Sequence, residues 1–271
     1  MGLRVTIVGG CGHVGIPLGL ALANAGHNVS LLDINERAVD LINQGKLPFQ
    51  EEGGAEVLSR VVGKALSATT DPEVIKSSQV VVFVTGTPVD EHLNPRVNDI
   101  ISVLKIYMHY LTPETLVVLR STVYPGVVEV VESLLTEALG STLVAFCPER
   151  IVQGKGIVEI GSLPQIISGT SKKAEELAHD LFSSIVPKTI LLSPREAEVA
   201  KLVTNSWRYL EFAIANQFFM MLEGQGLDFF RIFEALSDDY PRAQHFARPG
   251  LAAGPCLFKD TMQLSAFHQN Q

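Results

Sequence analysis

One cysteine lies in a setting that favours chemistry. Cys256 follows a loop of small residues, PGLAAGP, and starts a stretch, CLFKDTMQLSAF, whose pattern predicts a helix. A thiol at a helix N-terminus with Lys259 one turn further on is favoured as thiolate, the form that attacks carbonyl carbons. Asp260 comes four residues after Cys256 and is expected on the same helix face. A buried structural cysteine is the alternative interpretation of this segment alone.

A glycine-rich turn stands near the start of the chain. Gly10, Gly12 and Gly15 form the pattern GxGxxG between the apolar run RVTIVG and the amphipathic stretch IPLGLALANAG, and Asp33 ends the next apolar run. This context predicts a strand, turn and helix that bind a dinucleotide. Gly10 permits the tight turn, Gly12 lets backbone N–H groups approach the pyrophosphate, and Gly15 brings helix and strand together. The alternative is a glycine-rich turn without a ligand.

The acid after the second run indicates which dinucleotide binds. Asp33 would accept hydrogen bonds from ribose hydroxyls and repel a 2′-phosphate, so we expect NAD rather than NADP. Cys11, at a variable position of the turn, is expected to be a small filler.

Two further loops are expected at the same edge of the sheet. They are TGTP at residues 85–88 and STVYPG at residues 121–126. Ligands of open α/β sheets bind beyond the carboxyl ends of the strands, so both loops should border the cofactor, although Thr-Pro and Pro-Gly are also ordinary turn formers. The expected cofactor-binding residues are Gly10, Gly12, His13, Val14, Gly15, Asp33, Arg37, Thr85, Gly86, Thr87, Pro88, Ser121 and Thr122.

The elements that position these residues alternate along the chain. From Leu3 to Ser193, short β-branched runs alternate with amphipathic stretches of helical period, and the segment from Gly45 to Gly54 is the one loop without an obvious partner. This pattern predicts an α/β fold with a Rossmann-type, doubly wound, mostly parallel sheet. We expect this NAD-binding domain to span residues 1–192.

A long helix opens the second part of the chain. The sequence Ser193-Pro194-Arg195-Glu196 is a capping box with proline at the first helical position, and no breaker follows before Gly224. Such a helix is about 45 Å long and is apolar on nearly every side from Trp207 onward. Residues 193–271 are therefore expected to form a helical dimerisation and catalytic domain in a homodimer. A helix buried between two domains of one chain is the alternative.

The amino-acid composition indicates which kinds of partner the protein is not expected to bind. The net charge of −8 and the absence of Lys/Arg runs argue against nucleic acid and against an anionic membrane. No apolar stretch is long enough to cross a bilayer, and the chain is expected in the cytoplasm. The three cysteines form no paired spacing and the seven histidines show no ligand spacing, so neither a disulfide framework nor a metal site is expected.

Five ordered motifs together resemble one family, the UDP-glucose/GDP-mannose dehydrogenases, also called nucleotide-sugar 6-dehydrogenases. They are GxGxxG with its acid, STV-x-PG, PERI-x-x-GK at residues 148–155, AKL-x-x-N at residues 200–205, and G-x-C-x-x-KD at residues 254–260. The resemblance covers essentially the whole chain.

The resemblance implies oxidation of the C6 alcohol of a nucleotide-linked hexose to a carboxylate, in two hydride transfers that use two NAD+ and one water. It implies that Cys256 forms a thiohemiacetal and then a thioester, that Lys201 and Asn205 stabilise the oxyanion, and that Glu149 acts as base in thioester hydrolysis. The implied catalytic residues are Cys256, Lys201, Asn205, Asp260, Glu149 and Thr122. The implied substrate-binding residues are Glu149, Arg150, Lys201, Asn205, Arg208, Gly250 and Lys259.

Several residues differ from the family motifs, at positions that the resemblance places around the sugar of the substrate. Gln153 stands where the UDP-glucose type has a second acid, and the CPER segment resembles the branch that acts on UDP-N-acetylmannosamine. Ala252-Ala253 and Phe258 replace a common glycine and a common proline. A nucleotide-sugar substrate with UDP, TDP or GDP is therefore expected, with the hexose left open.

Two other functions are open at this point. A two-electron hydroxyacid dehydrogenase would also place a lysine and an asparagine one turn apart after a Rossmann domain, but a single hydride transfer needs no Cys256. A non-catalytic NAD-binding protein would bind NAD+ without producing NADH.

The resemblance also implies a further nucleotide-binding domain beyond the cysteine helix. Because the sequence stops at Gln271, we expect these 271 residues to bind NAD+ but to oxidise nucleotide sugars weakly or not at all.

Overall fold

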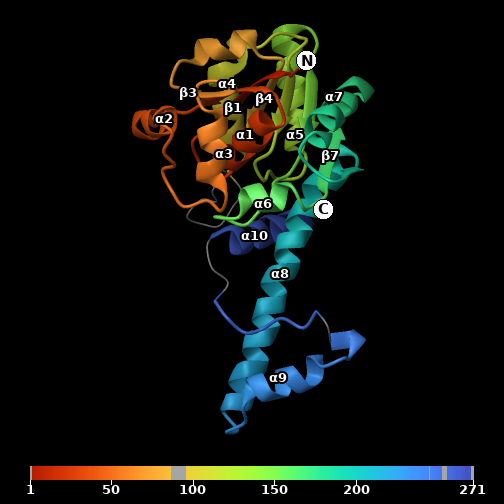
Figure 1. Cartoon of the computed structure of the whole chain (residues 1–271). Coiled ribbons are helices and arrows are strands. Elements are labelled where there is room, and N and C mark those ends of the chain that lie inside the picture. The colour runs from red at the N-terminus through yellow and green to blue at the C-terminus, as the bar shows by residue number, and fades with distance from the viewer. Residues whose placement is uncertain (1, 87–95, 244, 252–254, 270–271) are drawn as a thin grey trace. The chain divides into compact units, whose positions relative to one another are not determined.

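The computed structural model of the chain describes residues 2–86, 96–243, 245–251 and 255–269 (Figure 1). The described residues form two compact units. The first contains residues 2–86 and 96–201, and the second begins at Leu202. The division falls inside one long helix, so each unit contains part of it.

The first unit is built on a sheet of eight strands. The strands are β1 (Arg4–Val8), β2 (Asn28–Leu32), β3 (Leu66–Thr69), β4 (Val80–Phe83), β5 (Leu116–Leu119), β6 (Leu143–Phe146), β7 (Gln165–Gly169) and β8 (Thr189–Leu191). Their order is β3-β2-β1-β4-β5-β6-β7-β8. Among the described strands, β6 and β7 are the one antiparallel pair. The sheet confirms the predicted doubly wound, mostly parallel fold.

The helices connect these strands and then continue into the second unit. They are α1 (Gly15–Asn24), α2 (Glu36–Asn43), α3 (Gly54–Val61), α4 (Val97–Tyr107), α5 (Val127–Leu139), α6 (Gly156–Ile160), α7 (Lys172–Ser183), α8 (Pro194–Glu223), α9 (Phe229–Ser237) and α10 (Pro255–Gln269). Three short 3₁₀ helices are η1 (Pro72–Ser77), η2 (Met108–Tyr110) and η3 (Pro241–Ala243).

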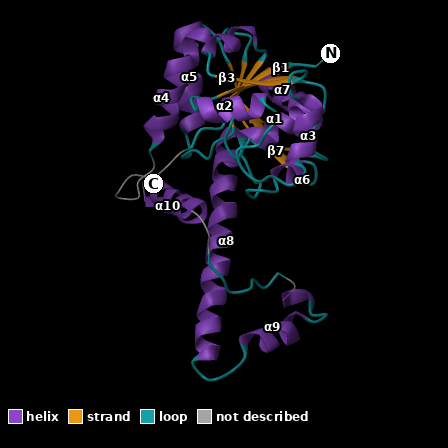
Figure 2. Cartoon of the chain, turned by 60° about the vertical axis from the view of Figure 1, so that its left-hand side comes forward, coloured by secondary structure: helices purple, strands orange, loops and turns teal. Residues whose placement is uncertain are grey.

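Both faces of the sheet are covered, which explains the apolar character of the strands. One hydrophobic cluster joins the sheet to α1, α2, α3 and α7, and the other joins it to α4 and α5. Figure 2 shows the strands between α4 and α5 on one side and α1 and α3 on the other. Parallel strands buried on both faces need β-branched and aliphatic residues on both sides.

The chain order reverses at β1, which pairs in parallel with both β2 and β4. Val5 of β1 lies opposite Val29 of β2 on one side and opposite Val80 of β4 on the other. In such sheets the crevice beyond the carboxyl ends of the strands at this point is where ligands bind. The glycine-rich turn follows β1 directly, so the fold places it at this crevice.

The loop from Gly45 to Gly54 does have a partner, contrary to expectation. Leu47 and Phe49 pack against the cluster beneath α1, and the backbone N–H of Glu52 donates to the carbonyl of Gly154 at 2.9 Å. The sequence did not reveal this contact because its two sides are about a hundred residues apart.

The capping box at the start of α8 is confirmed. Oε2 of Glu196 accepts hydrogen bonds from the backbone N–H and the hydroxyl of Ser193, at 2.8 and 2.6 Å. The helix continues for 30 residues to Glu223. The units divide between Lys201 and Leu202, whereas the domain boundary at residue 192 stays a prediction from the sequence.

Aromatic side chains form the interior of the second unit. Phe229 and Phe233 of α9 are buried. Phe219 of α8 meets Phe229 edge-on at 5.8 Å, and Phe246 contacts Phe233 at 5.8 Å between ring centroids. Within the described ranges, no helix combines the length and the apolar character that crossing a membrane requires.

Candidate active site

The glycine-rich turn has the geometry that a dinucleotide needs. A Cβ on Gly10 would come within 2.6 Å of the Ile7 carbonyl oxygen, and one on Gly15 within 2.5 Å of the Gly10 carbonyl oxygen. Both positions therefore need glycine for the turn to close. A Cβ on Gly12 would meet only the Gly9 carbonyl oxygen, at 3.5 Å. Glycine at this position leaves room for a phosphate, which fits the predicted cofactor.

Asp33 is fixed beside this turn at the end of β2. Its Oδ2 accepts the backbone N–H of Cys11 at 2.9 Å, and its Oδ1 accepts the backbone N–H of Asn35 at 3.0 Å. Burial, together with the nearby Asp33 charge, raises the pKa of Cys11 to about 12. The Cys11 thiol is thus protonated at neutral pH, and both oxygens of the Asp33 carboxylate are fixed by backbone N–H groups beside the turn.

The loops after β4 and β5 are tied together. The Ser121 hydroxyl donates to the Thr85 carbonyl oxygen at 2.5 Å, and Thr122 is half-buried and in contact with its surroundings. Gly86 is exposed. Thr87 and Pro88 lie outside the described residues.

Three other expected cofactor residues surround the turn. Val14 directly precedes α1, whereas His13 and Arg37 are exposed. His13 lies beside the ring of Phe49, with 3.8 Å between centroids. His13, next to the turn, and Arg37, at the start of α2, are therefore both accessible to a ligand.

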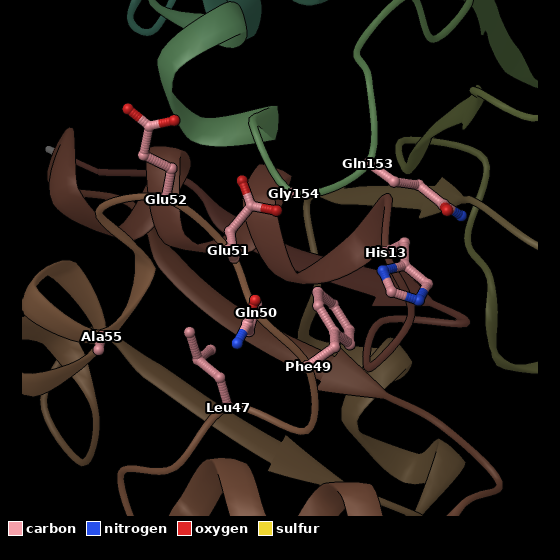
Figure 3. Close-up of a pocket in the computed structure, with 9 residues that line it drawn as sticks. All are labelled: His13, Leu47, Phe49, Gln50, Glu51, Glu52, Ala55, Gln153 and Gly154. Atoms are coloured by element: carbon pink, nitrogen blue, oxygen red, sulfur yellow. The ribbon is translucent and has the colours of Figure 1, made fainter.

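An open pocket adjoins the turn through His13. It encloses about 700 Å³, and Figure 3 shows the rings of His13 and Phe49 together at one end. Its lining is His13, Leu47, Phe49, Gln50, Glu51, Glu52, Ala55, Gln153 and Gly154. The loop after α2 and the segment after β6 therefore form one wall beside the predicted cofactor position.

Glu149 is anchored at the end of β6 by a residue that the sequence analysis missed. Arg120, which directly follows β5 and is 2% exposed, forms an ion pair with Glu149, with 2.6 Å between Nη2 and Oε2. Oε1 of Glu149 accepts the backbone N–H groups of Arg150 and Ile151, both at 2.5 Å. A charged residue directly after an apolar strand, as in LVVLR, was the available signal.

Arg120 is itself enclosed by polar partners. Its Nη1 donates to the Cys147 carbonyl oxygen at 3.3 Å and to Oε1 of Gln165 at 3.0 Å. Its guanidinium lies 5.2 Å from the ring centre of Phe182.

The neighbouring Arg150 has a different environment. Its guanidinium donates a hydrogen bond to the Pro164 carbonyl oxygen. Burial lowers the pKa of Arg150.

Lys201 ends the first unit. It lies on α8, is buried and is in contact with its surroundings. Thr122, Glu149 and Lys201 of the predicted catalytic set belong to this unit.

The second unit joins two other members of that set, Asn205 and Asp260, and the predicted substrate-binding residue Lys259. Nδ2 of Asn205 donates to Oδ2 of Asp260 at 2.5 Å, and Nζ of Lys259 lies 3.0 Å from Oδ1 of Asp260. Asp260 is only 1% exposed. The charge of Lys259 is therefore paired with Asp260, one residue further along α10.

Cys256 differs from the other two cysteines. It is exposed in the first turn of α10, whereas Cys147 is fully buried and burial raises its pKa to about 12. Of the three thiols, Cys256 is the one that a substrate can reach.

Two further predicted substrate residues lie on the surface of the second unit. Arg208 is exposed on α8. The backbone of Gly250 exchanges two hydrogen bonds of 2.9 Å with the side-chain amide of Asn216. In the part of the chain that the structure describes, no group of three His, Cys, Asp or Glu side chains is placed to hold a metal ion.

Known proteins share this sequence and fold. Residues 3–186 match the NAD binding domain of the UDP-glucose/GDP-mannose dehydrogenase family, and residues 195–271 match its central domain. A UDP-N-acetyl-D-mannosamine dehydrogenase from Pyrococcus horikoshii is 30% identical over 269 residues, which cover 95% of this chain and 63% of that protein.

Solved structures agree with the sequence matches. The structure of a UDP-D-ManNAc dehydrogenase from Pyrococcus horikoshii has a TM-score of 0.90 at 28% identity, covering 97% of this chain and 64% of that one. A UDP-glucose dehydrogenase from Pyrobaculum islandicum has a TM-score of 0.91 at 25% identity, covering 100% and 65%. The chain thus spans 63% to 65% of the length of these proteins. It belongs to the UDP-glucose/GDP-mannose dehydrogenase family, with NAD as the cofactor of its first domain.

Proposed function

We propose that the protein oxidises the C6 alcohol of a nucleotide-diphospho-hexose to the carboxylate. The observation that carries this proposal is the exposed Cys256 in the first turn of α10, in a chain whose other two cysteines are buried. A nucleophilic thiol is what distinguishes a four-electron oxidation from the single hydride transfer of a hydroxyacid dehydrogenase.

The first oxidation takes the alcohol to the aldehyde: the C6 carbon loses a hydride, and its hydroxyl loses a proton to water. The glycine-rich turn and Asp33 would hold NAD+, which when bound would supply the hydride acceptor for each oxidation. We assign to Lys201 and Asn205 the stabilisation of negative charge on the C6 oxygen, because an ammonium and an amide are both suitable donors. One Nδ2 hydrogen of Asn205 is bonded to Asp260, which orients the amide and leaves its second hydrogen for the substrate.

The thiol then takes part in the second oxidation. The Cys256 thiolate adds to the aldehyde carbon, and the new C–S bond gives a thiohemiacetal whose oxygen carries the negative charge. Loss of hydride from that carbon leaves a thioester. Water attacks the thioester carbonyl, the C–S bond breaks, and the acid and the free thiolate are released.

Glu149 is proposed to hold that water and to take its proton. Both carboxylate oxygens already have partners, Arg120 on one and two backbone N–H groups on the other. Each oxygen can accept more than one hydrogen bond, so these contacts fix the group and leave acceptor capacity for water. Thr122 and Asp260 complete the proposed set.

Trapping the thioester tests this sequence of steps. Glu149→Gln should slow hydrolysis, so that incubation with NAD+ and nucleotide sugar adds the mass of the substrate acyl group to Cys256. The double variant Glu149→Gln/Cys256→Ala should gain no mass. An adduct on another residue, or complete turnover in the double variant, would refute the role of Cys256.

The substrate is proposed to be a UDP-, TDP- or GDP-linked hexose. The relative with 30% identity is named for UDP-N-acetyl-D-mannosamine, and the similar structure from Pyrobaculum islandicum is named for UDP-glucose. Gln153, where the UDP-glucose type has an acid, favours the first of these sugars.

We also propose a homodimer through α8. From Trp207 onward, this helix exposes large apolar side chains. The Trp207 side chain is 61% exposed, and those of Ile214 and Phe218 are exposed as well. An apolar surface of this kind on one helix is typical of a subunit interface.

A further inference from the structure

The carboxylate of Glu198 makes a contact that the proposed mechanism does not use. Glu198 lies in the part of α8 that belongs to the first unit and is 1% exposed. Its Oε2 accepts the backbone N–H of Gly126 at 2.7 Å, and its Oε1 accepts the backbone N–H of Val128 at 2.9 Å. Burial raises the pKa of this carboxyl, and the two hydrogen bonds act in the opposite direction.

These two N–H groups belong to the start of α5. The first N–H groups of a helix have no partner within it, and a side chain just before the helix usually supplies one. Gly126 stands at this position with φ of 105° and has no side chain to offer. Glu198, about seventy residues further on, supplies both acceptors and places a negative charge at the positive end of the helix.

The surrounding contacts make this link a rigid one. Ala197 of α8 is fully buried in the same hydrophobic cluster as Val123 and Val127. A Cβ on Gly126 would lie 3.1 Å from the Arg195 guanidinium, which forms an exposed ion pair with Glu129 at 2.9 Å. The first turns of α8 therefore close onto the loop between β5 and α5.

The strand order places that loop on one side of the position expected for the cofactor. Asp33 follows β2, the glycine-rich turn follows β1, and Ser121 follows β5, and the sheet order is β2-β1-β4-β5. If Asp33 holds the adenosine ribose and the turn holds the pyrophosphate, the other half of NAD extends toward β4 and β5. Ser121 and Thr122 are then placed beside the nicotinamide riboside.

We infer that Glu198 is a positioning residue for the nicotinamide half of NAD. It fixes residues 121–126 onto α8, so that Ser121 and Thr122 are held in place before the cofactor binds. This inference rests on NAD as the cofactor and deepens the proposed function, since the nicotinamide is the part of NAD that accepts hydride.

Comparing the binding of two ligands, NAD+ and ADP-ribose, distinguishes this positioning role from a general effect on folding. ADP-ribose shares the adenosine and pyrophosphate groups with NAD+ but lacks nicotinamide. Calorimetric titration of the full chain with each ligand is therefore informative for Glu198→Gln, whose side-chain amide has one acceptor atom in place of two. The matched control is Glu129→Gln, which alters an exposed carboxylate at the same helix end.

We expect Glu198→Gln to bind NAD+ about tenfold more weakly while its affinity for ADP-ribose stays within about twofold. Glu129→Gln should bind both ligands as the unaltered protein does. An equal loss for both ligands, or no loss for either, would overturn the role of Glu198. If the unaltered protein bound neither ligand, the cofactor assignment behind the proposed function would fail instead.

Discussion

Nη2 of Arg120 lies 2.6 Å from Oε2 of Glu149, and this ion pair joins the end of β5 to the end of β6. Ser121 and Thr122 come directly after Arg120. The loop expected beside the cofactor and the carboxylate proposed to activate water are therefore both connected to one buried guanidinium. Breaking the pair should affect both the fold and the chemistry.

Glu149→Gln should destabilise the protein because it leaves the buried Arg120 charge without its counter-ion. The expected loss is about 3–5 kcal/mol in the free energy of unfolding, the range for removing one partner of a buried pair. Glu129→Gln, which breaks the exposed pair with Arg195, should cost no more than about 1 kcal/mol. Urea unfolding at neutral pH measures both. Equal losses of unfolding free energy in the two variants would show that the buried Arg120–Glu149 pair stabilises the fold no more than the exposed pair does.

Asp33→Ala should narrow the preference for NAD+ over NADP+. The carboxylate opposes a 2′-phosphate at close range, so we expect the ratio of dissociation constants to change by about tenfold or more. The substitution also removes the hydrogen bond to Cys11, so both affinities should fall and the ratio is the quantity to compare. Glu36→Ala, at an exposed acid in the first turn of α2, is the control. An unchanged ratio in Asp33→Ala would contradict the role of the carboxylate.

His27 should make stability depend on pH. Its Nδ1 accepts the backbone N–H of Leu3 at 3.1 Å, so the neutral ring carries its proton on Nε2, 3.0 Å from the Ser184 hydroxyl. Burial, with the charge of the N-terminus, lowers the pKa of His27 below its ordinary 6.5.

The folded state thus disfavours the protonated ring. The stability that His27 contributes is present above pH 6.5 and is lost as the pH falls through the lowered pKa. Unfolding free energies at about pH 7.5 and pH 5 should differ more in the unaltered protein than in His27→Gln. The same difference in both would assign the pH dependence to other groups.

A charge on the apolar face of α8 should dissociate or aggregate the proposed dimer. Phe218 is exposed on this helix, so Phe218→Asp places a carboxylate where we expect the second subunit. Gln217→Asp adds the same charge to the neighbouring exposed position and serves as control. Sedimentation at micromolar concentration should show a dimer for the unaltered protein and for the control. A monomeric unaltered protein would contradict the interface.

The sequence predicted those features whose causes are local. The capping box at Ser193 and Glu196 needs only residues three apart, and the glycine turn is defined by spacing between a strand and a helix. β3 has no such local signal, because its sequence, LSAT, has little β-branched character, and pairing with β2 holds it in place. Tertiary contact overrides weak local preference in such strands.

Arg120 and Glu198 could not be assigned from the sequence for a different reason. A buried charge is identified by its partner, and the partners are Glu149 for Arg120 and the start of α5 for Glu198. Neither partner is a neighbour in the sequence. The hydrogen bond between Asn205 and Asp260 could not be predicted from the sequence either, although both residues were expected in the site.

The central claim is a four-electron oxidation through Cys256, and the yield of NADH per sugar consumed tests it most directly. Nucleotide hexoses with UDP, TDP or GDP are each incubated with excess NAD+ until NADH stops forming, and the sugar acid is quantified by mass spectrometry. The ratio does not depend on how fast the reaction proceeds, so it applies to slow turnover as well. We predict two NADH for each sugar acid formed, and no acid from Cys256→Ala, which should still bind NAD+. One NADH per sugar, with an aldehyde or ketone as the final product, would contradict the account.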